Sequence, residues 1–464
     1  MRRVGRNIVS LLAADILRRL IGFTAVAYLA RILGTNGFGV VTIGWTVLSY
    51  GLVVSAAGLP TLGVKRTASG EGMADLPGII GARLVVSAAV YALILFVAAV
   101  FVQDRTTAAL MAVMSLAVFA QAVWPDWYFQ GMESVAPLAT SRVVSSAVYL
   151  IVVVVMVHSP HDVLWVAAGA VIGDVFAADY LVRNLRARGV SFRVRVEPSL
   201  VGSLLMQSIP LAIGGILASV SINYPPIALG LLRSNADVGI YGAASKLVFF
   251  LLVGDRIMST LLLPASSRLH AQSPEDLKDG LEYALRWILM ISLPVAAGGM
   301  VLAGPLVSIV FGPAYTDAIP VFQVFIWYFF FTMLHTVYTS GLIASGGSKI
   351  YGEVMMATAG FYAALVTGGV FVFGAVGGAF GAVLSEAISL VLMRRAFQAS
   401  VKLSTPRGVP GQLGAAAVMA AVVWLLSGKF LLLPLAAGVL VYPACLLLFR
   451  AATVDDVKNF IGRF

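Results

Sequence analysis

Long apolar runs separated by short polar stretches are the main pattern along the chain. Fourteen such runs can be delimited, and each is near the ~20 residues that an α-helix needs to cross a bilayer. They cover residues 7–33, 38–58, 78–102, 107–130, 137–158, 163–182, 200–232, 238–263, 283–302, 319–345, 351–373, 376–396, 412–426 and 431–449. Barrel strands are shorter and alternate in polarity, so the pattern predicts an all-α membrane protein with fourteen transmembrane helices.

Composition excludes the soluble classes. The 464 residues are 60% hydrophobic and 11% charged, whereas soluble domains are ~45–50% apolar and ~25% charged. The single cysteine, Cys445, lies in an apolar run, and the four histidines show no metal-ligand spacing. Motifs of nucleotide hydrolases, serine hydrolases and zinc proteases are missing from the sequence. We therefore expect no catalytic site, no metal site and no cofactor.

The basic residues predict the orientation in the membrane. The formal net charge is +10, and 31 residues are Lys or Arg. If both termini are cytoplasmic, twenty-three of these fall in inside segments and four in outside loops or their flanks. Cytoplasmic loops of membrane proteins carry this excess of positive charge. The charge is thus a topology signal and does not indicate binding to nucleic acid.

Short similarities at nearly constant separation indicate an internal repeat. The segment Gly169–Asp174 (GAVIGD) resembles Gly381–Glu386 (GAVLSE) at a separation of 212 residues, and Gly39 resembles Gly239 at 200. Two parallel copies of six helices are a transporter architecture, with the substrate site between the copies near mid-membrane. We expect one lobe at 1–198, a second at 199–400, and two additional helices with a cytoplasmic tail at 401–464.

Charged residues inside the predicted helices are candidates for function, because they are costly in a bilayer. The cations are Arg18, Arg19, Lys246 and Arg256. The acids are Asp15, Asp174, Asp255 and Glu386.

Structural alternatives stay open for several of these residues. Asp15 can pair with Arg18 or Arg19 on one helix face, and this pair is either structural or part of a cavity. Lys246 either lines a cavity or extends toward the membrane surface. His335 lies among aromatic residues and is expected to be a packed histidine.

Several short strings along the chain carry a resemblance to a known family. The stretch Tyr28–Gly39 (YLARILGTNGFG), with Gly34 and Gly39, resembles the opening of polysaccharide-repeat-unit flippases. The string Pro125–Glu133 (PDWYFQGME) resembles their fourth-helix motif and is the most specific match; it contains Asp126, Trp127, Gln130 and Gly131. Matches run from about residue 5 to about residue 350. The chain is similar to the O-antigen and exopolysaccharide flippases of the multidrug/oligosaccharidyl-lipid/polysaccharide (MOP) superfamily.

The resemblance implies a function and a fold. The fold would be MOP/MATE-like, with two pseudo-symmetric six-helix lobes plus two C-terminal helices. The protein would move undecaprenyl-pyrophosphate-linked oligosaccharides from the cytoplasmic to the outer leaflet of the bacterial inner membrane. Arg18, Arg19, Lys246 and Arg256 would hold the diphosphate. A proton or sodium ion on the acids would couple transport.

Partners and alternatives follow from the same resemblance. Polysaccharide polymerase and chain-length machinery are expected partners, and the protein itself is expected to be a monomer. Family members commonly have twelve helices, whereas fourteen is also the count in lipid II flippases. A lipid II flippase and a cation-coupled multidrug exporter of the same superfamily are therefore the alternatives. A membrane glycosyltransferase or polymerase is disfavoured, because the predicted outer loops are short.

Overall fold

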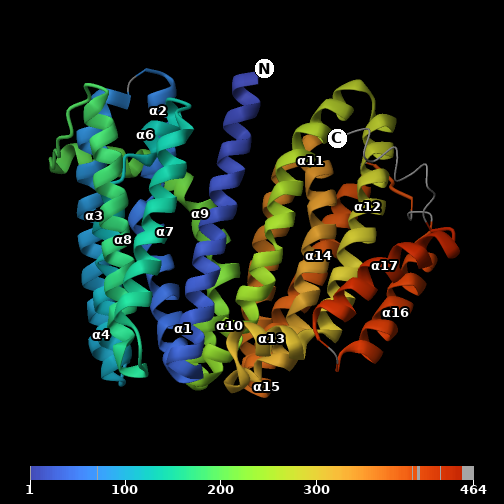
Figure 1. The fold of residues 1–464 in the computed structure, drawn as a ribbon. Coiled ribbons are helices and arrows are strands. Elements are labelled where there is room, and N and C mark those ends of the chain that lie inside the picture. Colours follow the sequence, from blue (N-terminus) through green and yellow to red (C-terminus); the bar gives the residue numbers. More distant parts are fainter. Residues whose placement is uncertain (1, 71, 400, 405–407, 429, 452–464) are drawn as a thin grey trace. The chain divides into compact units, whose positions relative to one another are not determined.

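The computed structural model is all-helical over the residues that it describes (Figure 1). These are residues 2–70, 72–399, 401–404, 408–428 and 430–451, with side chains left undescribed at 2–15, 135 and 213–222. Ten of the described helical segments are long and apolar enough to cross a membrane. The chain is therefore a multi-pass membrane protein. It divides into two compact units, Met1–Gly242 and Ala243–Phe464.

The first unit is a helical bundle. Its elements are α1 (Arg2–Ala56), α2 (Leu59–Ala68), α3 (Gly72–Phe101), α4 (Arg105–Ser115), α5 (Ala117–Ala122), α6 (Asp126–Gly131), α7 (Val135–Met156), the 3-10 helix η1 (Pro160–Asp162), α8 (Val163–Ala187) and α9 (Pro198–Leu232). Around α1 lie the helices α3, α4, α7 and α8 (Figure 1). Of these, α7 and α4 make the most extensive packing with α1. The core under α2 and α6 is built on Leu59, Ile79, Trp127 and Phe129.

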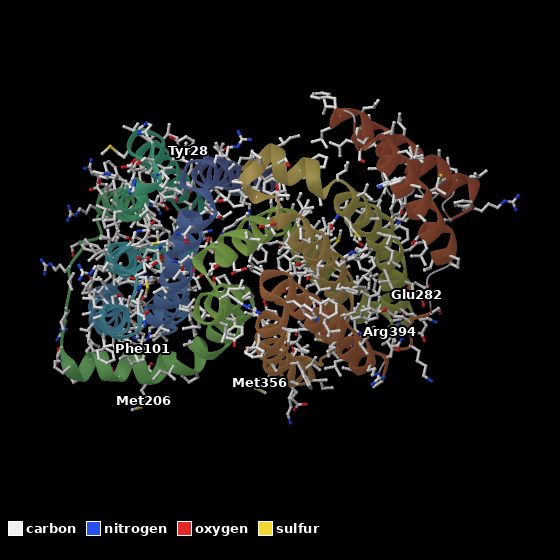
Figure 2. All side chains as sticks on the ribbon, turned by 90° about the horizontal axis from the view of Figure 1, so that it is seen from below. Tyr28, Phe101, Met206, Glu282, Met356 and Arg394 are labelled. Carbon is white, nitrogen blue, oxygen red and sulfur yellow. The ribbon has the colours of Figure 1, made fainter. Side chains whose placement is uncertain are left out.

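Helix α9 belongs to the first unit, because it packs against α1, α2 and α3. Its outer side chains point away from that bundle, as Met206 does in Figure 2, and Met206 is 79% exposed. Helix α10 (Asn235–Leu251) crosses the division between the units. The lobe boundary that the repeat predicts, at 198/199, therefore differs from this division and stays a prediction.

The second unit is also a bundle. Its elements are α11 (Val253–Gln272), α12 (Pro274–Val301), α13 (Ala303–Phe311), the 3-10 helix η2 (Pro313–Tyr315), α14 (Ala318–Ala344), α15 (Ser348–Gln398), α16 (Val409–Leu426) and α17 (Leu432–Leu448). Helix α14 packs against α11, α12 and α15. The pair α16–α17 attaches to α12 through an apolar cluster that includes Met290, Met419 and Tyr442. Glu282 of α12, labelled in Figure 2, accepts a hydrogen bond of 2.7 Å from the Ser404 backbone N–H.

Two long helices are broken at glycines. Gly34 breaks α1 with φ 65° and ψ −177°, and Gly374 breaks α15 with φ 59° and ψ −136°. Glycine adopts positive φ at little cost, so each break needs no connecting loop. The breaks fall between the predicted runs 7–33 and 38–58, and between 351–373 and 376–396. Dividing both helices at these breaks raises the ten candidate spans to twelve, and counting α9 and α17 as spans gives fourteen. The count of fourteen stays a prediction.

Candidate substrate and ion sites

Lys246 is a basic residue within an apolar helix. It lies in α10, between the buried residues Ala244 and Val248, and its own side chain is half-buried. No hydrogen bond or ion pair joins it to any residue in the part of the chain that the structure describes. A cation at the centre of a membrane helix costs at least ~2.5–3.5 kcal/mol on insertion scales. Because no described acid pairs with it, Lys246 is suited to meet an anion that comes from outside the chain.

The other predicted cations differ from Lys246. Arg18 and Arg19, in the first half of α1, are half-buried, and each already makes a non-covalent contact. Arg256, in the first turn of α11, is exposed. The side chain of Asp15 lies outside the described residues, so its predicted pairing with Arg18 or Arg19 stays a prediction.

Asp174 is a buried carboxylate that neutral groups surround. It lies in α8 and is 8% exposed. Its Oδ2 accepts a hydrogen bond of 2.9 Å from Gln121 Nε2, and its Oδ1 accepts one of 2.9 Å from Ser145 Oγ. Gly173 permits this approach of α8 to α7, because a Cβ there would lie 2.6 Å from the carbonyl oxygen of Ser145. Both carboxylate oxygens are thus satisfied within the first unit.

Glu386 lies in a different environment in the second unit. Its Oε1 is 3.0 Å from Nδ1 of His335 on α14. The other ring nitrogen, Nε2, is 3.5 Å from Ser389 Oγ, one turn beyond Glu386 on α15. Asp255 of α11 accepts a hydrogen bond from Thr336, the residue after His335. His335 is therefore more than a packed histidine: it joins an acid of α15 to a cluster that also contains an acid of α11.

Asp174 and Glu386 share one structural feature. Each acid lies on the helix that the predicted repeat places last in its lobe. Each is bound by a side chain from the helix that the repeat places fourth, Gln121 in α5 and His335 in α14. The chemistry of the two contacts differs, because Gln121 is an amide and His335 can carry a proton.

The fourth-helix motif is a packing element. Trp127 is fully buried against Gly63 of α2, where a Cβ would lie 2.4 Å from its ring. Gly131 packs against Thr67, because a Cβ on Gly131 would lie only 2.5 Å from the Cβ of Thr67. Asp126 is 3.8 Å from the guanidinium of Arg83, whose Nη1 also donates a hydrogen bond of 2.9 Å to the Trp124 carbonyl. Gln130 is exposed. The motif thus joins α2, α3 and α6, and the sequence did not single out Arg83.

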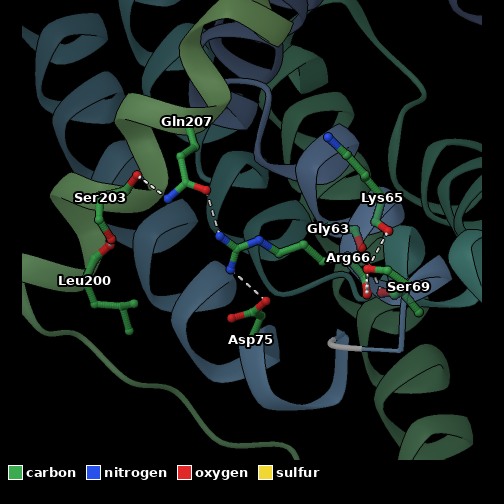
Figure 3. Close-up of polar contacts among 9 residues, drawn as sticks. Gly63, Lys65, Arg66, Ser69, Asp75, Leu200, Ser203 and Gln207 are labelled. Atoms are coloured by element: carbon green, nitrogen blue, oxygen red, sulfur yellow. Dashed lines mark hydrogen bonds and ion pairs between the residues drawn. The ribbon is translucent and has the colours of Figure 1, made fainter.

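Arg66 connects three elements of the first unit (Figure 3). From α2, its Nη1 donates to Asp75 Oδ2 of α3 at 2.7 Å, and its Nη2 donates to Gln207 Oε1 of α9 at 2.8 Å. Lys65, next to it, is exposed. Arg66 therefore fixes the N-terminal third of α9 to the bundle.

The sequence matches a known protein family over more than half of its length. The family described as "Polysaccharide biosynthesis protein" matches residues 4–270. This chain belongs to the polysaccharide biosynthesis protein family. The match contains the Trp127 motif, Asp174, Lys246 and Asp255, whereas His335 and Glu386 lie beyond it. No curated protein matches the sequence.

The fold of this polysaccharide biosynthesis protein is that of MOP-superfamily transporters. A structure of the lipid II flippase MurJ in an inward closed conformation matches with a TM-score of 0.77 and 13% identity, over 95% of this chain and 99% of that one. An inward-facing multidrug resistance MATE transporter of the MOP superfamily matches with a TM-score of 0.68 and 13% identity, over 84% and 98%. A MOP-superfamily transporter from Pyrococcus furiosus matches with a TM-score of 0.55 and 13% identity, over 84% and 93%. The predicted MOP/MATE-like fold class is confirmed.

Proposed function

We propose that this protein flips undecaprenyl-pyrophosphate-linked oligosaccharide repeat units from the cytoplasmic to the outer leaflet by alternating access. Membership of the polysaccharide biosynthesis protein family supports a lipid-linked saccharide as cargo. The transporter fold supports movement across the bilayer rather than catalysis. The protein would act in the bacterial inner membrane with both termini in the cytoplasm, as the distribution of Lys and Arg predicts.

The single observation that carries the proposal is Lys246. A diphosphate brings negative charge into a region of low dielectric, where a fixed cation is needed to accept it. Lys246 has that charge and no partner among the described residues. Arg18, Arg19 and Arg256 stay candidates for further phosphate contacts, because arginine binds phosphate oxygens with two donors at once.

A lipid II flippase is the second candidate. The similarity to MurJ extends over 95% of this chain, compared with 84% for the MATE transporter. Lipid II also carries a polyprenyl diphosphate, so Lys246 suits both cargoes. A multidrug exporter of cationic compounds is disfavoured, since an unpaired cation repels such cargo.

Reconstitution with defined cargoes tests the proposal. Purified protein in vesicles is given labelled undecaprenyl-pyrophosphate oligosaccharide, labelled lipid II or a cationic dye, and the label reaching the opposite leaflet is measured against empty vesicles. We expect movement of the oligosaccharide lipid and none of the dye. Movement of lipid II alone would replace the first candidate by the second, and movement of the dye alone would overturn both.

A further inference from the structure

We propose that His335 and Glu386 form a proton-binding site whose occupancy drives the transport cycle. The site lies entirely in the second unit, where α14 supplies the imidazole and α15 the carboxylate. Their side chains are 12% and 13% exposed, and the 3.0 Å separation between Nδ1 and Oε1 permits a direct N–H to carboxylate hydrogen bond. That driving role rests on the proposed transport function, whereas proton binding at the site does not.

The chemistry of the pair suits a reversible proton. Histidine is the side chain whose ordinary titration range includes physiological pH. When a proton binds the ring of His335, both nitrogens become donors, and Nδ1 donates to Glu386 while Nε2 faces the Ser389 hydroxyl. When the proton leaves to water, one ring nitrogen becomes an acceptor and the ion pair is lost. Binding therefore changes the charge of the site by one unit and breaks no covalent bond.

Asp255 extends the effect of this proton from the His335–Glu386 pair to the packing of a third helix, α11. It is the titratable group that faces the pair from α11, held by Thr336, and its charge acts on both His335 and Glu386. With His335 neutral, ionised Asp255 and Glu386 repel one another across a poorly hydrated region. A protonated His335 offsets that repulsion, so the proton favours the packing of α11, α14 and α15 around it.

A polar stripe on α14 points to an access route. Thr332, His335, Thr336 and Thr339 follow one another at helical spacing and are all half-buried. The residues between them, such as Met333, Leu334 and Val337, are buried and apolar. Thr332 Oγ1 and Thr339 Oγ1 have no hydrogen-bond partner among the described residues. Polar residues of a membrane helix face the bundle interior or a water-filled cavity, and these two buried hydroxyls without a partner suit a short chain of buried water beside His335.

Asp174 provides the contrast within the same chain. Its two oxygens already accept hydrogen bonds from an amide and a hydroxyl, and neither donor titrates. Its role is to join α8 to α5 and α7. We therefore place the proton at the His335–Glu386 pair of the second unit and not at Asp174 in the first.

Two readouts test this site. In the first, flipping of labelled oligosaccharide lipid is measured in vesicles with and without a pH gradient, acidic on the delivery side. The gradient is expected to accelerate wild type, the surface control Asp179→Asn and Asp174→Asn. Glu386→Gln and His335→Gln are expected to flip at one rate under both conditions.

The second readout needs no cargo. The infrared difference between acidic and neutral pH is recorded on purified protein, and Glu386→Gln and His335→Gln are expected to remove a component that wild type and Asp179→Asn retain. If the gradient response and the spectrum survive both substitutions, or if Asp174→Asn alone abolishes them, the site is wrong. If wild type moves no oligosaccharide lipid yet the component depends on Glu386 and His335, the proposed function fails and the proton site stands.

Discussion

The backbones of Gly39 and Gly239 touch each other within the first unit. A Cβ on Gly39 would lie 3.1 Å from the nitrogen of Gly239, and one on Gly239 would lie 3.0 Å from the nitrogen of Gly39. The surrounding contacts are reciprocal as well: Gly39 faces the Asn235 carbonyl, and Gly239 faces the Thr35 carbonyl. Gly39 and Gly239 are 200 residues apart, and so are Thr35 and Asn235, which is the separation that the repeat predicts. Reciprocal contacts of this kind are characteristic of two equivalent elements that meet face to face.

Alanine at either glycine should destabilise the protein. A Cβ would lie 1.7 Å from the Asn235 oxygen in Gly39→Ala and 1.9 Å from the Thr35 oxygen in Gly239→Ala. Backbone atoms cannot rotate away, so α1 and α10 must separate, at a cost of about 1–3 kcal/mol or more. The unfolding midpoint in detergent should fall for both variants.

Gly22→Ala is the matched control. It changes the same residue type in α1, but a Cβ there meets nothing within 4 Å. Its midpoint should equal that of wild type or exceed it, since alanine favours a helix over glycine. Equal midpoints for Gly39→Ala and Gly22→Ala would refute the close contact.

Arg66→Ala should loosen α9. The substitution removes charged hydrogen bonds to Asp75 and Gln207, whose loss costs about 1–3 kcal/mol. Backbone amides near residue 207 should exchange hydrogen faster. Arg183→Ala is the comparison, because its ion pair with Asp179 is 76% and 52% exposed and should contribute under ~1 kcal/mol. If both variants exchange like wild type, Arg66 does not fix α9.

Asp104 should make the start of α4 sensitive to acid. The Thr107 hydroxyl, helped by the backbone N–H groups of Thr106 and Thr107, holds the pKa of Asp104 below its ordinary value of 3.8. Because the folded pKa is lowered, this stabilisation is present above about pH 4 and is lost as pH falls through the folded pKa.

Hydrogen exchange at Thr106 and Thr107 measures the effect. Protection, corrected for intrinsic rates, should fall several-fold below pH 4, as expected for an N-cap of about 1 kcal/mol. Asp104→Asn keeps an acceptor that does not titrate, so its protection should be independent of pH in this range. A wild type that shows no acid response would contradict the cap.

Reporter fusions test the predicted topology. A reporter that matures only in the cytoplasm should be active after Phe464 and inactive at Ser427, between α16 and α17, because fourteen spans return the C-terminus to the side of the N-terminus. A fusion at Arg188, after α8, should also be active. The reverse result at Phe464 and Ser427 would mean that the helix count is wrong by one.

Apolar run length predicted the fold well, because the bilayer demands helices of a set length. It could not predict the breaks at Leu252 and Val123, where one predicted run becomes two or more helices. Nor did it place α9 with the first unit, since that depends on packing against α2 and α3 rather than on polarity.

The candidate site was harder to predict. Lys246, Asp174 and Glu386 were found from their charges alone, because a charge in an apolar run is visible in any sequence. The His335–Glu386 pair was missed because the two residues are 51 positions apart and meet only through the α14–α15 contact. One sequence pattern could have indicated the pair, namely the helical spacing of the polar residues Thr332, His335, Thr336 and Thr339. The aromatic residues next to His335 favoured the packed-histidine interpretation instead.

Flipping of labelled undecaprenyl-pyrophosphate oligosaccharide by Lys246 variants tests whether this lysine accepts the diphosphate of the cargo. The assay compares wild type, Lys246→Arg and Lys246→Gln at equal amounts of folded protein in vesicles. Because a cation is what the diphosphate requires, we expect Lys246→Arg to retain much of the wild-type rate and Lys246→Gln to lose at least about tenfold, which corresponds to ~1.4 kcal/mol. A folded Lys246→Gln that flips the lipid at the wild-type rate would show that Lys246 does not hold the diphosphate.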